Sequence, residues 1–255
     1  MFKKRHATPA VTLKETWKDG DAVTKLSFFI MGLNAIRHRQ WVKGFSLLFA
    51  EIVFLVWFFL SGIHLIAGLS NLGAIKSKRV VFNKAQGVYV TQQPDNSVLI
   101  LLFGILALFI VAGFIYLYII NLKSNKHTFL LEKRHEHIPT NREEIASLFD
   151  QRLHATLMTI PIVLIILFTV LPTVFMISMA FTNYDRQHSV GFSWTGFQAF
   201  GNVLSGDLAG TFFPVLGWTL IWAVAATATT FFFGVLLALS VSYTHLRAHE
   251  TGAYL

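Results

Sequence analysis

Residues 98–120, VLILLFGILALFIVAGFIYLYII, contain no charged side chain and decide the class of fold. A helix rises about 1.5 Å per residue, so roughly 20 apolar residues cross the hydrocarbon core of a bilayer. The run is continuously apolar, whereas a membrane barrel strand alternates apolar and polar residues. Because a helix satisfies its own backbone hydrogen bonds in lipid, the run predicts a transmembrane helix.

Three other stretches have the length and composition of a span: residues 45–69, 157–181 and 213–239. The first begins too far along the chain, and is too long, to be a cleaved signal peptide. It contains Glu51 and His64, whereas the other two contain no Asp, Glu, Lys or Arg. The sequence therefore predicts an all-α polytopic membrane protein with four transmembrane helices.

The composition agrees with a lipid environment. Hydrophobic residues make up 54% of the 255 residues and charged residues 13%, about half the charged share of a soluble domain. This excludes intrinsic disorder and argues against an ordinary cytosolic enzyme. The absence of cysteine excludes disulfides and thiolate metal sites.

The basic charges indicate the orientation of the spans. The formal net charge is +8, and alternate loops place 16 Lys and Arg on one side of the membrane and 5 on the other. Positively charged loops stay inside, which predicts a multi-pass plasma-membrane protein with a cytoplasmic N-terminus. The charge is thereby explained by membrane topology, and no nucleic-acid partner is expected.

These features divide the chain into six parts. They are an amphipathic cytoplasmic segment (1–43), the first two spans with their outer loop (44–122), a cytoplasmic loop (123–156), the third span with its outer loop (157–211), the fourth span (212–240) and a tail (241–255).

Three shorter elements are expected between the spans. Residues 22–38 predict one amphipathic helix, which either lies in the headgroup plane against membrane lipid or packs on another subunit. Thr140 and Glu143 have the spacing of a capping box and predict a short helix leading into the third span. Residues 80–82 and 88–90, around Gly87, predict a small hairpin.

The polar residues near or within the spans have structural interpretations as well as functional ones. For Glu51, interfacial anchoring or an interhelical hydrogen bond is favoured over a proton relay, because it can reach back to the interface. His64 is interpreted as a packing residue. The His135-Glu136-His137 run is interpreted as a solvated surface, with a metal site as the alternative.

The third and fourth spans contain further signals. Pro161 and Pro172 lie about three turns apart and predict a bent helix. The fourth span is rich in Ala, Thr and Gly, which predicts close packing in a helix bundle. Trp218 and Trp222 belong either to an interfacial aromatic belt or to a surface that stacks on sugar.

The sequence contains no GxxxxGK[ST], HExxH or GxSxG motif. If ATP drives this protein, another chain must therefore bind it.

Several elements resemble the permease subunits of maltose/maltodextrin-type ABC importers. The residues that carry the resemblance are Leu171-Pro172, AFTNYD at 180–185, WTGF at 194–197, WTL at 218–220, and residues 231–234 and 236–239. Residues 19–21, 30–32 and 43–44 are similar to the longer-headed versions typical of Gram-positive bacteria. The resemblance covers nearly all of residues 1–239.

The resemblance implies a role and a set of partners. It implies one half of a sugar pathway, paired with a second permease subunit, two ATP-binding subunits and an extracellular sugar-binding protein. Maltodextrins or related oligosaccharides are the implied substrates. It transfers no catalytic, cofactor-binding, metal or substrate-binding residue to this chain, because the family's sugar contacts and coupling loop lie mainly in later spans. No cofactor is expected.

The end of the sequence departs from that family. Residues 242–251, SYTHLRAHET, resemble the translation of a sequencing adapter, so we expect a truncated protein with a non-native tail from about residue 241. A genuine short tail is the alternative. It would fit a second hypothesis for function, a small non-transport membrane protein such as an assembly factor or a sensor anchor.

Overall fold

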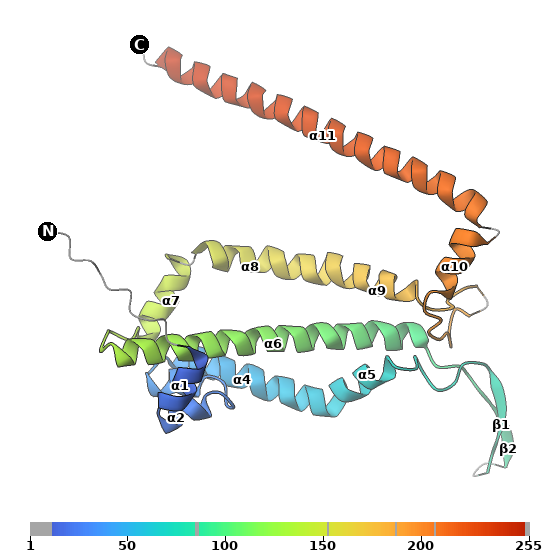
Figure 1. Cartoon of the computed structure of the whole chain (residues 1–255), viewed down its shortest axis with the longest axis horizontal. Helices are drawn as coiled ribbons and strands as arrows, with labels where there is room; N and C mark the ends of the chain where they lie inside the picture. Colours follow the sequence, from blue (N-terminus) through green and yellow to red (C-terminus); the bar gives the residue numbers. More distant parts are fainter. Residues whose placement is uncertain (1–11, 85–86, 152, 187, 207, 253–255) are drawn as a thin grey trace. The chain divides into compact units, whose positions relative to one another are not determined.

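A computed structural model describes residues 12–84, 87–151, 153–186, 188–206 and 208–252, and most of them are helical (Figure 1). The chain forms two units that divide between Trp194 and Thr195. The first unit holds three long apolar helical stretches and the second holds one.

The prediction of four spans is confirmed. The described chain has four helical stretches long and apolar enough to cross a membrane: Trp41–Gly68, Ser97–Lys133, Leu153–Met179 and Ala209–Ser242. Each one overlaps a span expected from the sequence. The helices begin earlier or end later than the apolar runs because polar residues extend them past the hydrocarbon.

The first and third stretches are each interrupted by a π-helical turn. The first consists of α4 (Trp41–Trp57), η1 (Phe58–Gly62) and α5 (Ile63–Gly68). The third consists of α8 (Leu153–Ile165), η2 (Ile166–Val170) and α9 (Leu171–Met179). Pro172 lies in the first turn of α9, directly after η2. A widened turn relieves the clash of a proline ring with the carbonyl four residues earlier. A π-helical turn therefore lies between Pro161 and Pro172, where the sequence predicted a bent helix.

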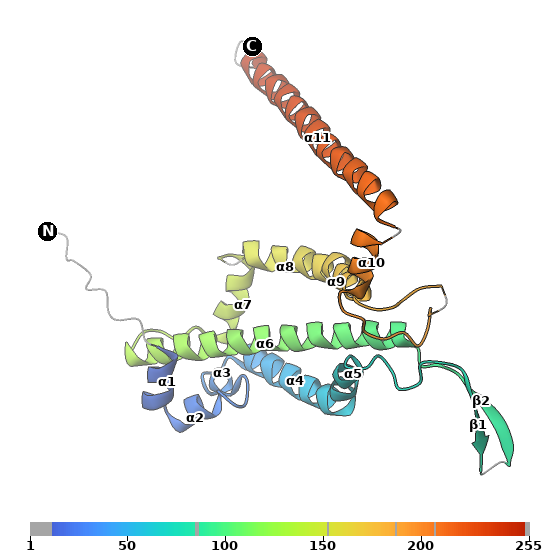
Figure 2. The same cartoon turned by 45° about the vertical axis from the view of Figure 1, so that its right-hand side comes forward.

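The second stretch, α6 (Ser97–Lys133), is the central helix of the first unit. Both views show it between α4–α5 and α8–α9 (Figures 1 and 2). We name the end of these helices where α4 begins and α6 ends the N-side, and the opposite end the hairpin side. The buried apolar cluster of Leu72, Leu101, Ile105 and Phe192 lies on the hairpin side.

A glycine permits the close contact between α5 and α6. A Cβ atom on Gly104 would lie 2.3 Å from Leu69 Cδ2 and 3.1 Å from the Leu65 carbonyl oxygen. In lipid, such small residues allow helix backbones to approach one another. Gly113, two and a half turns further along α6, instead faces an open apolar groove and has no neighbour within 4 Å of a Cβ position.

The hairpin and the short helix before the third span are confirmed. Strand β1 (Arg79–Asn83) pairs antiparallel with β2 (Val88–Gln92), and Val81 faces Val90 across the ladder. Helix α7 (Asn141–Phe149) begins with the predicted capping box between Thr140 and Glu143.

The prediction of one helix over residues 22–38 is wrong. The segment forms α2 (Ala22–Leu26) and α3 (Leu33–Arg37), joined by a turn and preceded by α1 (Leu13–Asp19). Gly32 precedes α3 with a φ of 78°, and a Cβ atom there would lie 2.2 Å from the Gly44 carbonyl oxygen of α4. The turn therefore follows from close contact with the first span, which local periodicity does not reveal.

The second unit contains α10 (Gln198–Ser205) and α11 (Ala209–Gly252). The small residues of α11 line shallow apolar grooves, one of them formed by Ala223, Val224, Thr227, Ala228 and Phe231. The expected packing of this helix in a bundle stays a prediction.

The contrast between the two glycines of α6 yields a test of the packing. Gly104→Leu should destabilise the folded protein by about 1–3 kcal/mol, because the added side chain overpacks the contact with Leu65 and Leu69. Gly113→Leu, the matched control, should change stability little, since its side chain enters the open groove. Unfolding in detergent micelles measures both. Equal losses would show that the α5–α6 contact is not as close as described.

Candidate functional site

The polar residues singled out in the sequence lie in different places. The Glu51 carboxylate on α4 accepts a hydrogen bond of 2.7 Å from the Met31 backbone N–H. It therefore anchors the N-terminal segment, in place of a contact between spans. His64 lies on α5 and is exposed. His137 lies 2.9 Å from Glu143, and both are exposed to solvent. Within the described ranges, no group of three or more His, Asp or Glu residues could hold a metal ion.

Glu51 belongs to a larger set of contacts that we name the N-side network. It joins Glu51 on α4, and Asn121 and Asn125 on α6, to the segment α1–α3. The segment contributes Thr24, Ser27, Met31, Gly32 and Asn34.

Asn121 uses both ends of its side-chain amide in this network. Its Oδ1 accepts from the Gly32 N–H at 3.0 Å, and its Nδ2 donates to the Ser27 carbonyl at 2.9 Å. Asn121 is buried, and so are its two partners. Buried backbone groups need such partners, because a buried donor or acceptor left without one costs about 1–3 kcal/mol.

Asn125 repeats this arrangement one turn further along α6. Its Nδ2 donates to the Thr24 carbonyl at 3.0 Å, and its Oδ1 accepts from Asn34 Nδ2 at 2.6 Å. Residues four apart share one face of a helix, so the two asparagines form a polar strip on α6. The available sequence signal was this pair of amides directly after an apolar run, and it was missed.

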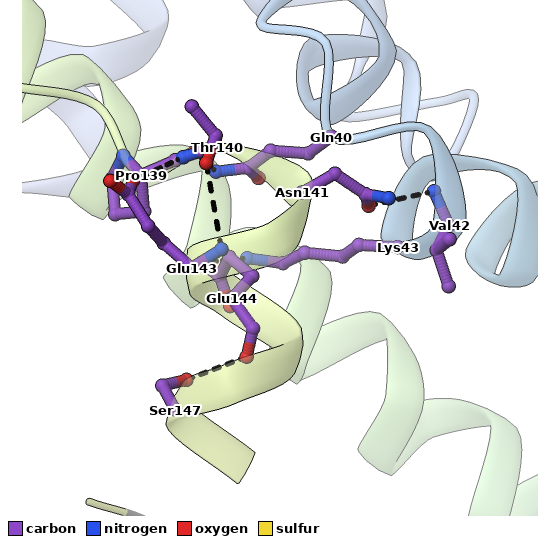
Figure 3. A network of polar contacts seen from close by, with 9 residues as sticks. All are labelled: Gln40, Val42, Lys43, Pro139, Thr140, Asn141, Glu143, Glu144 and Ser147. Atoms are coloured by element: carbon purple, nitrogen blue, oxygen red, sulfur yellow. Dashed lines mark hydrogen bonds and ion pairs between the residues drawn. The ribbon is translucent and has the colours of Figure 1, made fainter. Parts of the chain in front are cut away.

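A second set of contacts, the α4–α7 junction, joins the start of the first span to the helix before the third (Figure 3). Gln40 donates to the Pro139 carbonyl at 2.7 Å, and Asn141 accepts from the Val42 N–H at 3.1 Å. Lys43 and Glu144 form an ion pair at 3.0 Å. These contacts link the entry points of two spans on the N-side.

The capping box orders the start of α7 within this junction. The Glu143 carboxylate accepts from the Thr140 N–H at 2.7 Å. That hydrogen bond, with a smaller contribution from His137, holds the pKa of Glu143 below its usual value. The carboxylate thus stays charged and stabilises the first turn of the helix.

On the hairpin side, polar contacts close the loops over the end of α6. The Asp95 carboxylate accepts from the Ala74 and Ile75 N–H groups at 2.7 and 2.9 Å, which lowers its pKa. Ser97 donates to the Leu72 carbonyl at 2.5 Å and lies 3.2 Å from the Phe192 carbonyl. The loops after the first and third spans are thereby held to one helix.

The AFTNYD element that carries the resemblance has a structural role in this region. Asn183 bonds to Ser193 through its backbone N–H at 3.1 Å and its side-chain Oδ1 at 2.7 Å. Tyr184 contacts the buried Phe192 edge to face, with ring centroids 5.6 Å apart. The element therefore shapes the loop after the third span.

Trp218 and Trp222 lie on α11 in the second unit. Their rings stack on one another, with centroids 6.4 Å apart and planes at 15°, and both side chains are exposed. Such a pair suits either an interfacial belt or a sugar face. The assignment of no catalytic, metal, cofactor or substrate-binding residue stays a prediction.

The N-side network yields a second test. Asn121→Ala should lower the free energy of unfolding by about 2 kcal/mol or more, because it leaves the Gly32 N–H and the Ser27 carbonyl without their partner. Limited proteolysis should then cut the α1–α3 segment faster. Lys123→Ala, an exposed position on the same helix, is the matched control and should shift stability by about 0.5 kcal/mol at most. If the two variants behave alike, Asn121 does not hold the segment.

Comparison with known proteins gives several extended matches. The chain is 29% identical over 233 residues to the galactooligosaccharides transport system permease protein GanP of Bacillus subtilis, which covers 88% of this chain and 51% of GanP. It is 30% identical over 228 residues to the maltodextrin transport system permease protein MdxF of the same organism, covering 86% and 48%. The maltodextrin transport system permease protein MalC of Streptococcus pneumoniae is 28% identical over 218 residues, covering 82% and 46%.

The chain thus spans about half the length of the curated relatives it matches. No family model and no solved structure matches it. The matched relatives are permease proteins of sugar transport systems, and they cover most of this chain. Over most of its length, the chain is homologous to sugar transport permeases, which confirms the resemblance found in its sequence.

Proposed function

We propose that this chain is part of the permease subunit of an ATP-driven carbohydrate importer. The observation that carries the proposal is the similarity to GanP and MdxF over 86–88% of the chain. The four apolar helices support it, because a permease needs several spans to enclose a pathway. The same similarity gives no support to the alternative of a small non-transport membrane protein.

In this role the chain performs no chemistry of its own. It forms one side of a pathway that alternates between outward and inward access, and the ATP-binding partners bias the two states. The proposed assembly contains a second permease subunit, two ATP-binding subunits and an extracellular sugar-binding protein. The contacts that link spans on both sides of the first unit would allow its helices to move together.

Oligosaccharides are the proposed substrates, and maltodextrins the proposed member of that class. Two of the three relatives described above are named for maltodextrin transport and one for galactooligosaccharides. Both kinds of substrate are short chains of sugar units. The comparison therefore supports oligosaccharides as a class more strongly than it supports one type of glycosidic linkage.

Deletion of the gene from the organism that carries it tests this proposal. Uptake of radiolabelled maltotetraose should be lost and then restored by the reintroduced gene, whereas glucose uptake should be unchanged. A galactotetraose competitor shows which linkage is preferred. The proposal would be overturned if the deletion strain still took up both maltotetraose and galactotetraose. It would also be overturned if uptake of these sugars continued after ATP was depleted.

We further propose that the N-side faces the cytoplasm, as the distribution of Lys and Arg indicates. The cysteine-free sequence allows a direct test by single-cysteine labelling. Thr91→Cys in β2 and Glu136→Cys before α7 are both at exposed positions. In intact cells, a membrane-impermeant maleimide should label the Thr91→Cys variant at once and the Glu136→Cys variant after permeabilisation. The reverse order would contradict this orientation.

A further inference from the structure

Helix α2 and the turn after it, residues 22–30, have their polar and apolar surfaces reversed relative to a soluble helix. Thr24 and Ser27 are 0% and 1% exposed, and their backbone carbonyls accept hydrogen bonds from Asn125 and Asn121 of α6. Phe29 is 69% exposed, and its neighbours Leu26 and Ile30 are exposed as well. Water would favour the opposite arrangement, because exposing apolar surface to it is unfavourable. A segment in lipid turns its polar groups toward protein partners and its apolar groups outward.

The contacts of the segment place it at the depth of the membrane boundary. Its Met31 N–H bonds to Glu51, which lies ten residues and about 15 Å along α4 from Trp41. Its Gly32 N–H bonds to Asn121, the first polar residue after the apolar run of α6. That run is about 35 Å long, and a hydrocarbon core is about 30 Å thick, so Asn121 lies where the hydrocarbon meets the headgroups.

An aromatic cluster forms the outward surface of the segment. Trp17 on α1 contacts Phe28 and Phe29 edge to face, with ring centroids 5.3 and 5.8 Å apart. Trp17 is 44% exposed. Tryptophan and phenylalanine side by side are typical of segments that lie at a membrane interface.

The charges around this cluster complement an anionic lipid surface. Lys14, Lys18 and Lys25 lie on α1 and α2. Among the acidic residues of the segment, Asp21 forms an ion pair with Arg37 at 2.7 Å, and the Glu15 carboxylate accepts from the Thr12 N–H. Asp19 is the remaining acidic residue of α1–α3. Each basic residue near an anionic leaflet contributes about 1 kcal/mol.

We propose that the turn at residues 28–30, with Trp17, inserts as a wedge into the anionic phospholipid leaflet on the N-side. Phe28, Phe29 and Ile30 lie among the upper acyl chains, and the lysines contact the headgroup phosphates. The N-side network makes the insertion possible, because it satisfies the backbone of the turn that would otherwise lose its hydrogen bonds to water. The inference does not depend on which molecule the protein transports.

Site-directed spin labelling of the full chain tests the wedge. The chain is reconstituted in nanodiscs of phosphatidylethanolamine and phosphatidylglycerol, 3:1, as single-cysteine variants Phe29→Cys and Tyr89→Cys. Tyr89 in β2 is a matched control, because it is an aromatic residue with a similar exposed fraction of 73%. The label at residue 29 should collide more with oxygen than with a water-soluble nickel chelate, and the label at residue 89 should show the opposite preference.

Three results would overturn the proposal. A residue 29 label as accessible to nickel as the residue 89 label would place the turn in water. A residue 29 label protected from both reagents would show that a protein covers this surface. An unchanged oxygen preference after phosphatidylglycerol is replaced by phosphatidylcholine would remove the role of the anionic lipid, whereas a shift toward nickel accessibility supports it.

Discussion

Backbone groups that lie at the edge of the hydrocarbon must find hydrogen-bond partners within the protein, and Asn121 and Asn125 supply them for the N-terminal segment. Both ends of each amide are used, so the 27–32 turn can leave helical geometry close to the membrane. The polar face of the segment is thereby turned inward and its aromatic face outward. The irregular course of the chain before the first span follows from this constraint.

The same helix organises both ends of the first unit. On the N-side α6 holds α1–α3, while Lys43 and Glu144 join the start of the first span to α7, the helix before the third span. On the hairpin side, Ser97 of α6 contacts the loops that follow the first and third spans. These contacts link the helices of the first unit to one another at both ends. In the permease role proposed from the similarity to GanP and MdxF, this linkage would let the helices of the unit move together.

Features set by local sequence were predictable, and features set by distant partners were not. The apolar runs predicted the four spans. The capping-box spacing of Thr140 and Glu143 predicted the start of α7, and the residues around Gly87 predicted the hairpin. The break between α2 and α3 could not be predicted, because Gly32 meets Gly44 and Asn121, the latter 89 residues away. The amphipathic helix predicted over residues 22–38 is broken, but Leu26 and Ile30 form an exposed apolar surface there, and the polar Thr24 and Ser27 are buried. No substrate-binding residue was predicted, and none has been assigned.

Hydrogen exchange at the Met31 and Gly32 amides of the full chain in nanodiscs shows whether the spans hold the N-terminal segment. Both amides should exchange slowly, as the amides of α6 do, because Glu51 and Asn121 accept their hydrogen bonds. Exchange at the rate of an unstructured peptide would show that Glu51 and Asn121 do not hold the segment on the spans.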